Sequence, residues 1–203
     1  MLGKLVSEAR LQEFLSRLLG RAVELNDPIT LSSARKAQVA SWLRSENIPF
    51  AYKDVNVGVT SVARILGSAA GPAAVPVPAP DGPPFPASSA SGGLSVGIDL
   101  ESAANLPVAD DFRTHPFYKA NFTPREIAHC IERGDPIESF CGLWAAKEAV
   151  VKAGGASPAE GRFREVEIIL EPGGKPTFPA CALSISHESG FAVAVCIRLD
   201  VRV

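Results

Sequence analysis

Residues 71–93, GPAAVPVPAPDGPPFPASSASGG, are dominated by proline, glycine, alanine and serine. Proline and glycine oppose regular structure, so the Pro-rich half is expected to be extended and the Ser/Gly end flexible. A structureless stretch of this length is uncommon inside a compact domain, although a long surface loop is the alternative. The sequence therefore predicts two folding units, residues 1–70 and 94–203, with a linker at 71–93 that lets them move relative to each other.

Residues 135–155, DPIESFCGLWAAKEAVVKAGG, carry the start and stop signals of a helix. Asp135 suits the N-cap, Pro136 suits the first helical position, and Glu138 is placed as in a capping box. The Gly154-Gly155 pair is typical of a helix end. The apolar residues that recur near helical spacing, and so predict one buried stripe, are Phe140, Leu143, Trp144 and Val151.

Glu148 and Lys152 lie one turn apart on this helix and therefore share a face. Taken alone, such a pair is usually a surface ion pair worth about 0.3–0.5 kcal/mol. Upstream, however, an apolar strand beginning at Val96 ends with Asp99 and Glu101. Carboxylates that are buried or half-buried are costly without a cation. Three carboxylates and an ammonium suit a magnesium-dependent reaction on a phosphate ester, which we expect at this site.

Five segments of residues 94–203 together resemble the 4′-phosphopantetheinyl transferase superfamily. They are VGIDLE at 96–101, NFTPRE at 121–126, LWAAKEAVVK at 143–152, GKP at 174–176, and SISH at 184–187 followed by a second strand from Phe191. The resemblance implies an α+β fold, in which a single lobe combines an antiparallel sheet with a long helix. SISH comes last, as in the holo-acyl-carrier-protein synthase type, whose single lobe forms trimers with coenzyme A (CoA) between subunits. The Asp99-x-Glu101 pair and Leu143-Trp144 are instead similar to the two-lobed type.

The activity that the resemblance implies is transfer of 4′-phosphopantetheine from CoA to a serine of an apo acyl carrier protein of a fatty-acid or polyketide synthase. The serine oxygen would attack the β-phosphorus and 3′,5′-ADP would leave. The resemblance further implies a Mg²⁺ site formed by Asp99, Glu101 and Glu148. Lys152 would pair with the phosphates, and either Glu148 or a metal-bound water would accept the serine proton.

Three more residues are candidates for contact with CoA. Lys147 lies about 100° around the helix from Glu148, so it would meet another part of CoA. Lys175, in the Gly-Gly-Lys-Pro turn, is expected to line the nucleotide pocket or to be solvated. For His187 the resemblance suggests a phosphate contact, with a structural hydrogen bond at a hairpin end as the alternative.

Two other functions compete with the enzyme. One is an inactive relative that binds CoA or a carrier as a scaffold, although the intact Asp99, Glu148 and Lys152 oppose it. The other is a docking module of a synthase, in which the N-terminal unit recruits a partner.

The composition fits an intracellular enzyme, with 46% hydrophobic residues and a net charge of −2. No apolar run is long enough to span a membrane and the N-terminus lacks an apolar signal core, so we expect a cytoplasmic protein with no nucleic-acid or membrane partner. The cysteines lack C-x-x-C spacing and are expected to be reduced and structural. They are Cys130, Cys141, Cys181 and Cys196.

Residues 1–70 resemble an acyl carrier protein in the spacing of the expected helices and in the helix-breaking residues between them. One helix should end at Gly20, a second should run from Ser32 or Ser33 to about Glu46, and a last one should span Val59–Leu66. Ser33 falls at the acceptor position of a carrier, but the Asp-Ser-Leu motif is absent and the serine is more simply a helix N-cap. This segment also holds nine Lys/Arg against six Asp/Glu, whereas carriers are acidic. We therefore expect a carrier-like unit that is not itself modified.

Overall fold

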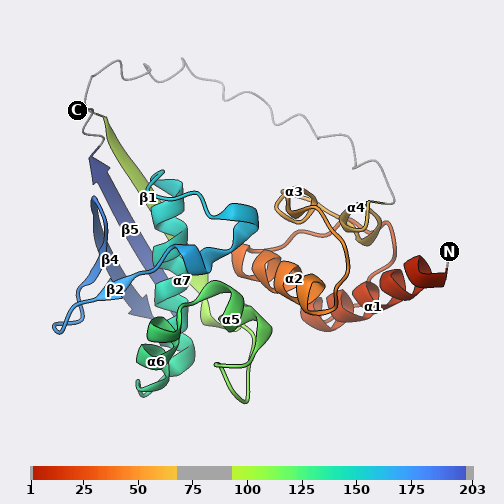
Figure 1. Ribbon diagram of the computed structural model, residues 1–203, viewed down its shortest axis with the longest axis horizontal. Helices are drawn as coiled ribbons and strands as arrows, with labels where there is room; N and C mark the ends of the chain where they lie inside the picture. The colour runs from red at the N-terminus through yellow and green to blue at the C-terminus, as the bar shows by residue number, and fades with distance from the viewer. Residues whose placement is uncertain (1, 68–92, 200–203) are drawn as a thin grey trace. The chain divides into compact units, whose positions relative to one another are not determined.

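The computed structural model describes residues 2–67 and 93–199, which belong to two compact units, Met1–Pro83 and Pro84–Val203 (Figure 1). Nearly all of the predicted linker, together with residues 68–70, lies outside the described residues. The two units are considered separately below. None of the described helices is long and apolar enough to cross a membrane.

The described part of the N-terminal unit is helical, as predicted. Its elements are α1 (Leu2–Leu19), α2 (Ser33–Ser45), α3 (Tyr52–Val55) and α4 (Val62–Ile65). Gly20, with φ of 65°, follows α1, and the Ser32 hydroxyl caps α2 by accepting a hydrogen bond from the Arg35 amide. The predicted helix at Val59–Leu66 is shorter than expected because Thr60 forms a bridge with Ile29 and Ser61 caps α4.

A single apolar core holds these helices together. Phe14 of α1 stacks on Trp42 of α2 with ring centroids 4.5 Å apart. The buried members of the core are Leu11, Leu15, Val23, Ile29, Leu31, Val39, Leu43, Ile48, Val55, Val62 and Ile65. Helices of this length are stable mainly through such packing rather than through intrinsic propensity.

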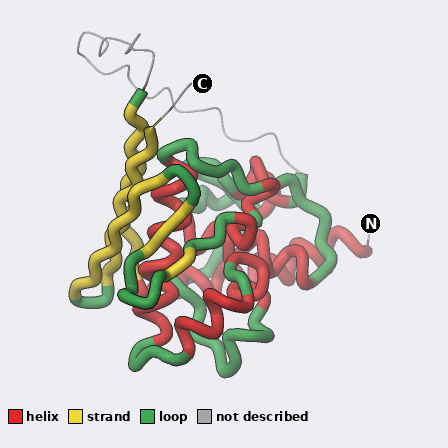
Figure 2. Tube along the Cα trace, turned by 60° about the vertical axis from the view of Figure 1, so that its left-hand side comes forward, coloured by secondary structure: helices red, strands yellow, loops and turns green. Residues whose placement is uncertain are grey.

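The C-terminal unit is built on a five-stranded antiparallel sheet, which Figure 2 shows in yellow. Its strands are β1 (Leu94–Ser102), β2 (Ile169–Leu170), β3 (Pro176–Phe178), β4 (Cys181–Glu188) and β5 (Phe191–Leu199), in the order β1-β5-β4-β3-β2. The helices are α5 (Pro116–Asn121), α6 (Pro124–Ile131) and α7 (Pro136–Lys152), with short 3₁₀ turns η1 (Ala103–Asn105), η2 (Ala159–Gly161) and η3 (Phe163–Glu165). The predicted α+β class, with its antiparallel sheet and long helix, is confirmed.

The long helix α7 packs on β1, β5 and β4 (Figure 1). It begins as predicted, with Asp135 accepting a hydrogen bond from the Glu138 amide, and Gly154, with φ of 68°, follows its end. The prediction of a single buried stripe was wrong, because every residue from Phe140 to Val150 is buried. An aromatic cluster accounts for this, since Phe117, Phe122 and Phe163 contact the Trp144 ring.

Candidate active site

Strand β1 brings Asp99 and Glu101 to the face of the sheet that α7 covers. Residues alternate along the strand, with Gly97, Asp99 and Glu101 buried and the intervening side chains exposed. A Cβ atom at Gly97 would lie 1.9 Å from the Ala149 carbonyl oxygen, so only glycine permits the observed approach of strand to helix. This close contact sets the two carboxylates beside α7.

Asp99 and Lys152 form an ion pair between β1 and the end of α7. The Lys152 amino group lies 2.7 Å from Asp99 Oδ1 and also donates a hydrogen bond to the Ile98 carbonyl at 3.1 Å. Asp99 is only 6% exposed and its second oxygen, Oδ2, is buried without a hydrogen-bond partner. A buried carboxylate oxygen in that state retains its capacity to accept a hydrogen bond or bind a cation.

Glu101 is held by hydrogen bonds to residues that closely follow it in the chain. Its Oε1 accepts hydrogen bonds from the Ser102 amide at 2.8 Å and from Asn105 Nδ2 at 2.7 Å. Glu148, the third predicted carboxylate, is buried on α7 one turn before Lys152. Within residues 2–67 and 93–199, no three His, Cys, Asp or Glu side chains lie close enough together to hold a metal ion. The predicted three-carboxylate set is thus not assembled by the protein alone.

The structure places Lys147 in the interior of the C-terminal unit. It is fully buried, and its amino group lies 2.9 Å from Glu126 Oε2, 3.1 Å from the Phe163 carbonyl and 2.6 Å from the Val166 carbonyl. Burial lowers the pKa of Lys147, while the neighbouring Glu126 raises it in part. The prediction that Lys147 contacts CoA does not fit this geometry, because all three donors of its ammonium group face protein acceptors.

His187 lies at a cavity of about 230 Å³ beside the N-terminal half of α7. Gly142 makes room for its ring, since a Cβ atom there would lie 2.2 Å from His187 Nε2. Gly174 and Pro176, which flank Lys175 in the β2–β3 turn, also line this cavity. His129 and Arg133 add basic groups that the sequence prediction missed. His129 lies in α6 and Arg133 just after its end, both outside the segments that carry the resemblance, so no local signal marked them.

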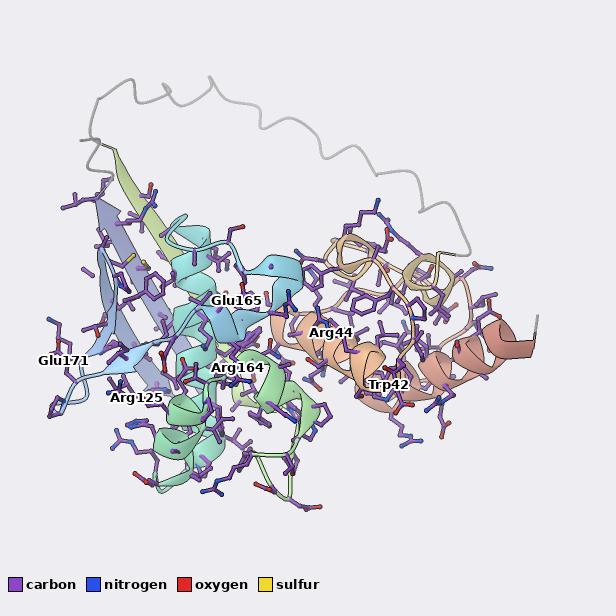
Figure 3. The ribbon with its side chains drawn as sticks, viewed as in Figure 1. Trp42, Arg44, Arg125, Arg164, Glu165 and Glu171 are labelled. Atoms are coloured by element: carbon purple, nitrogen blue, oxygen red, sulfur yellow. The ribbon has the colours of Figure 1, made fainter. Side chains whose placement is uncertain are left out.

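A second cavity, of about 260 Å³, has a basic rim. Arg113, Lys119 and Arg164 line it together with Phe122, Pro124 and Ile127. Arg164 belongs to η3, which packs against α5, and Figure 3 shows its side chain beside that helix. Arg164 is far from Arg113 and Lys119 in the sequence, so only the fold brings the three basic residues to one cavity.

The family model described as "4'-phosphopantetheinyl transferase superfamily" matches residues 95–196. A holo-acyl-carrier-protein synthase of Chlorobaculum tepidum is 33% identical over 113 residues, which cover 51% of this chain and 97% of that protein. Fatty acid synthase subunit alpha of Candida parapsilosis is 39% identical over 83 residues, which are 40% of this chain and 4% of that subunit.

Among solved structures, the Helicobacter pylori holo-acyl-carrier-protein synthase in complex with coenzyme A has a TM-score of 0.42 and 28% identity, over 52% of this chain and 99% of that one. The extent of the family match and the near-complete coverage of the Chlorobaculum protein define the class. The chain belongs to the 4′-phosphopantetheinyl transferase superfamily. Its C-terminal unit is accordingly a transferase domain.

Proposed function

We propose that the C-terminal unit transfers 4′-phosphopantetheine from CoA to a serine of an apo acyl carrier protein and releases 3′,5′-ADP. Membership of the transferase superfamily supports this reaction, as does the likeness to a protein named as a holo-acyl-carrier-protein synthase. The likeness to a fatty acid synthase subunit favours a carrier of fatty-acid synthesis.

The observation that carries the proposal is the Asp99–Lys152 pair. It combines an ammonium, on a side chain that is 47% exposed, with a buried carboxylate whose Oδ2 has no protein partner. A phosphate ester needs a cation to pair with its oxygens, and a divalent ion shared with that ester needs a carboxylate. The carboxylate comes from β1 and the ammonium from α7, and these two elements pack directly against each other.

The orphaned Asp99 oxygen fits Mg²⁺, which uses only one or two carboxylates and completes its shell with phosphate oxygens and water. Asp99 would hold the ion, with Glu148 and Glu101 as the neighbouring carboxylates. Bound there, Mg²⁺ would neutralise charge on the pyrophosphate of CoA. A cation held chiefly by its substrate is consistent with the lack of a three-ligand protein cluster among the described residues.

The chain's own residues then have separate tasks. Lys152 pairs with the phosphate oxygens as a point charge and holds the β-phosphorus in line with the attacking serine oxygen. The bond from that phosphorus to the bridging oxygen of 3′,5′-ADP breaks as the new ester bond forms. Glu148 accepts the proton of the serine hydroxyl. His187, with Lys175 in the adjacent turn, contacts the nucleotide end of CoA at the cavity beside α7.

The basic rim of the second cavity is the proposed docking surface for the carrier. Carrier proteins are acidic, and Arg113, Lys119 and Arg164 concentrate positive charge although residues 94–203 hold 11 Lys/Arg against 15 Asp/Glu. Local complementarity of this kind steers association even when the overall charge opposes it.

The uncovered face of the sheet supports self-association into a trimer. On β1, Leu94, Val96, Ile98 and Leu100 are 50–67% exposed, and on β5 Phe191, Val193, Ile197 and Leu199 are 36–67% exposed. A contiguous apolar face of this kind marks an interface, and closed cyclic symmetry buries it without leaving open ends.

The N-terminal unit is proposed to be a carrier-like domain that is not a substrate. Ser32 provides the N-cap of α2, and Ser33 is the first helical residue, followed closely by the basic Arg35 and Lys36. Because an acidic carrier is the expected substrate, a basic segment at this position opposes modification of Ser33.

One experiment tests the transfer reaction. The full chain is incubated with CoA, MgCl₂ and a panel of purified apo carrier proteins, and every protein is then weighed by intact mass spectrometry. A carrier that gains one phosphopantetheine mass, in the presence but not the absence of MgCl₂, establishes the enzyme. No gain on any carrier would favour an inactive scaffold or docking module. The same spectra show whether the chain itself gains mass, and Ser33→Ala identifies the position.

A further inference from the structure

Two cysteines of the C-terminal unit lie on neighbouring strands, two positions apart in register. Cys181 of β4 pairs with Arg198 of β5, and Cys196 of β5 pairs with Leu183 of β4. The cysteines are therefore diagonal neighbours on one face of an antiparallel ladder, where side chains are within reach of each other. The Cys181 thiol is close enough to contribute to the rise in the pKa of Cys196.

The surroundings give the two thiols different properties. Cys196 is fully buried, whereas Cys181 is partly exposed. Burial is the largest cause that raises the pKa of Cys196, to about 12; the neighbouring Cys181 thiol adds to the rise, and Arg198 partly offsets it. Solvent can thus reach Cys181 directly, whereas Cys196 has no exposed surface.

The pair lies under the C-terminal end of α7. A Cβ atom at Gly155 would lie 3.1 Å from Cys181 Sγ, and one at Gly154 would lie 3.6 Å from Arg198 Nη2. These glycines directly follow the turn that carries Lys152. A covalent change at the thiols would therefore occur beside the end of the helix that positions the lysine of the active site.

We propose that Cys181 and Cys196 form an oxidation site that closes to a reversible intrachain disulfide. A peroxide is the oxidant. The Cys181 thiol ionises, its sulfur attacks one oxygen of hydrogen peroxide, the O–O bond breaks, and the departing hydroxide takes up the released proton to form water, so that Cys181 becomes a sulfenic acid. The Cys196 sulfur then attacks that sulfur, the S–O bond breaks, and the departing hydroxide takes the thiol proton to form a second water.

The bond can open again by thiol–disulfide exchange, in which a thiolate attacks one sulfur and the other leaves. Cys181 is partly exposed, so its sulfur is the one that an external thiol can attack. The site therefore suits reversible closure.

The test uses the full chain, purified in reductant, desalted, and titrated with hydrogen peroxide before alkylation with iodoacetamide in denaturant. Trypsin leaves both cysteines on one peptide, residues 165–198, because Lys175 precedes a proline. The expected result is that this peptide loses two hydrogen masses without being alkylated, and that cleavage at Glu188 leaves its halves joined until dithiothreitol is added. Cys130 and Cys141 should both be alkylated.

Two pairs of variants complete the test. Cys181→Ser and Cys196→Ser should each abolish the cross-link, whereas Cys130→Ala and Cys141→Ala should each retain it. The proposal is overturned if peroxide leaves both Cys181 and Cys196 open to alkylation, or drives Cys181 to sulfinic acid without a cross-link. A disulfide that includes Cys130 or Cys141 would overturn it equally. These readouts do not depend on transferase activity.

Discussion

The amino group of Lys147 lies 2.8 Å from Oε1 and 2.9 Å from Oε2 of Glu126, and neither side chain has appreciable contact with solvent. The same carboxylate accepts hydrogen bonds from the backbone amides of Thr123 and Ile168. Together with the carbonyls of Phe163 and Val166, these bonds join α6, α7 and the irregular chain between η3 and β2. The Lys147–Glu126 pair thus fixes these segments against the helix that carries Glu148 and Lys152.

Replacement of Lys147 by methionine should lower the free energy of unfolding by about 3–5 kcal/mol, because it leaves the Glu126 charge buried without a cation. Urea unfolding followed by circular dichroism measures the loss. Arg162→Gln, at the exposed Arg162–Glu165 pair, is the matched control and should cost less than about 1 kcal/mol. A Lys147→Met protein as stable as the parent would contradict the structural role.

Asp99→Ala should abolish transfer while the folded state survives, because it removes the proposed metal ligand and leaves Lys152 free to extend into water. Lys152→Ala should raise the KM for CoA more than it lowers kcat, since it removes a charge that pairs with phosphate. It should also destabilise the protein more than Asp99→Ala, because it strands a buried carboxylate. Steady-state kinetics and urea unfolding test both. Asp110→Ala, at an exposed loop position, is the control, and full activity in Asp99→Ala would refute the assignment.

Gly97→Ala should disrupt the site from a position that bears no functional group. The new methyl would lie 1.9 Å from the Ala149 oxygen and 2.6 Å from the Ala153 nitrogen, so β1 and α7 must separate. We expect an unfolding free energy lower by about 1–3 kcal/mol, as for overpacked cores, and a loss of transfer activity. Gly134→Ala, where a Cβ meets nothing within 4 Å, should leave both unchanged. Equal effects of the two substitutions would argue against the close contact.

Leu100→Lys should convert a trimer into monomers. Leu100 is 67% exposed and pairs across the sheet with Val193. The ammonium group of a lysine at this position would therefore fall within the proposed apolar interface. Light scattering coupled to size exclusion should give three copies for the parent and one for the variant. Val108→Lys, at a residue that is 90% exposed outside the sheet, should remain trimeric. An active monomer in the parent would exclude this assembly.

The stability of the protein should fall as the pH drops below about 6.5, in part through His115. Its Nδ1 accepts the Phe117 amide hydrogen at the start of α5, and burial lowers its pKa below 6.5. The unfolded chain therefore takes up the proton first, and stability is lost as the pH falls from 6.5 toward the folded-state pKa. His115→Ser keeps a capping oxygen without a titrating group, so urea midpoints between about pH 7.5 and 5 should depend less on pH. His129→Gln is the control and should retain the parent's dependence.

Features that depend on residues close to one another in the chain were predictable from the sequence. The bounds of α7 follow from Asp135 and Gly154, and Asp99 and Lys152 stand in segments that resemble those of a known family. The role of Lys147 was not predictable, because its partners are Glu126, 21 positions upstream, and the carbonyls of Phe163 and Val166, 16 and 19 positions downstream. His129 and Arg133 were missed for the same reason, since they line the cavity together with residues of α7, of the β2–β3 hairpin and of β4.

The burial of α7 gives its two lysines opposite accessibility to reagents. Lys147 is sealed in the interior, while the Lys152 side chain is 47% exposed and still tied to Asp99. An amine-directed label applied to the folded protein would therefore modify this helix only at its C-terminal end. Because Lys152 is proposed to pair with phosphate, bound CoA should protect it from the label, whereas Lys147 should stay unlabelled with or without CoA.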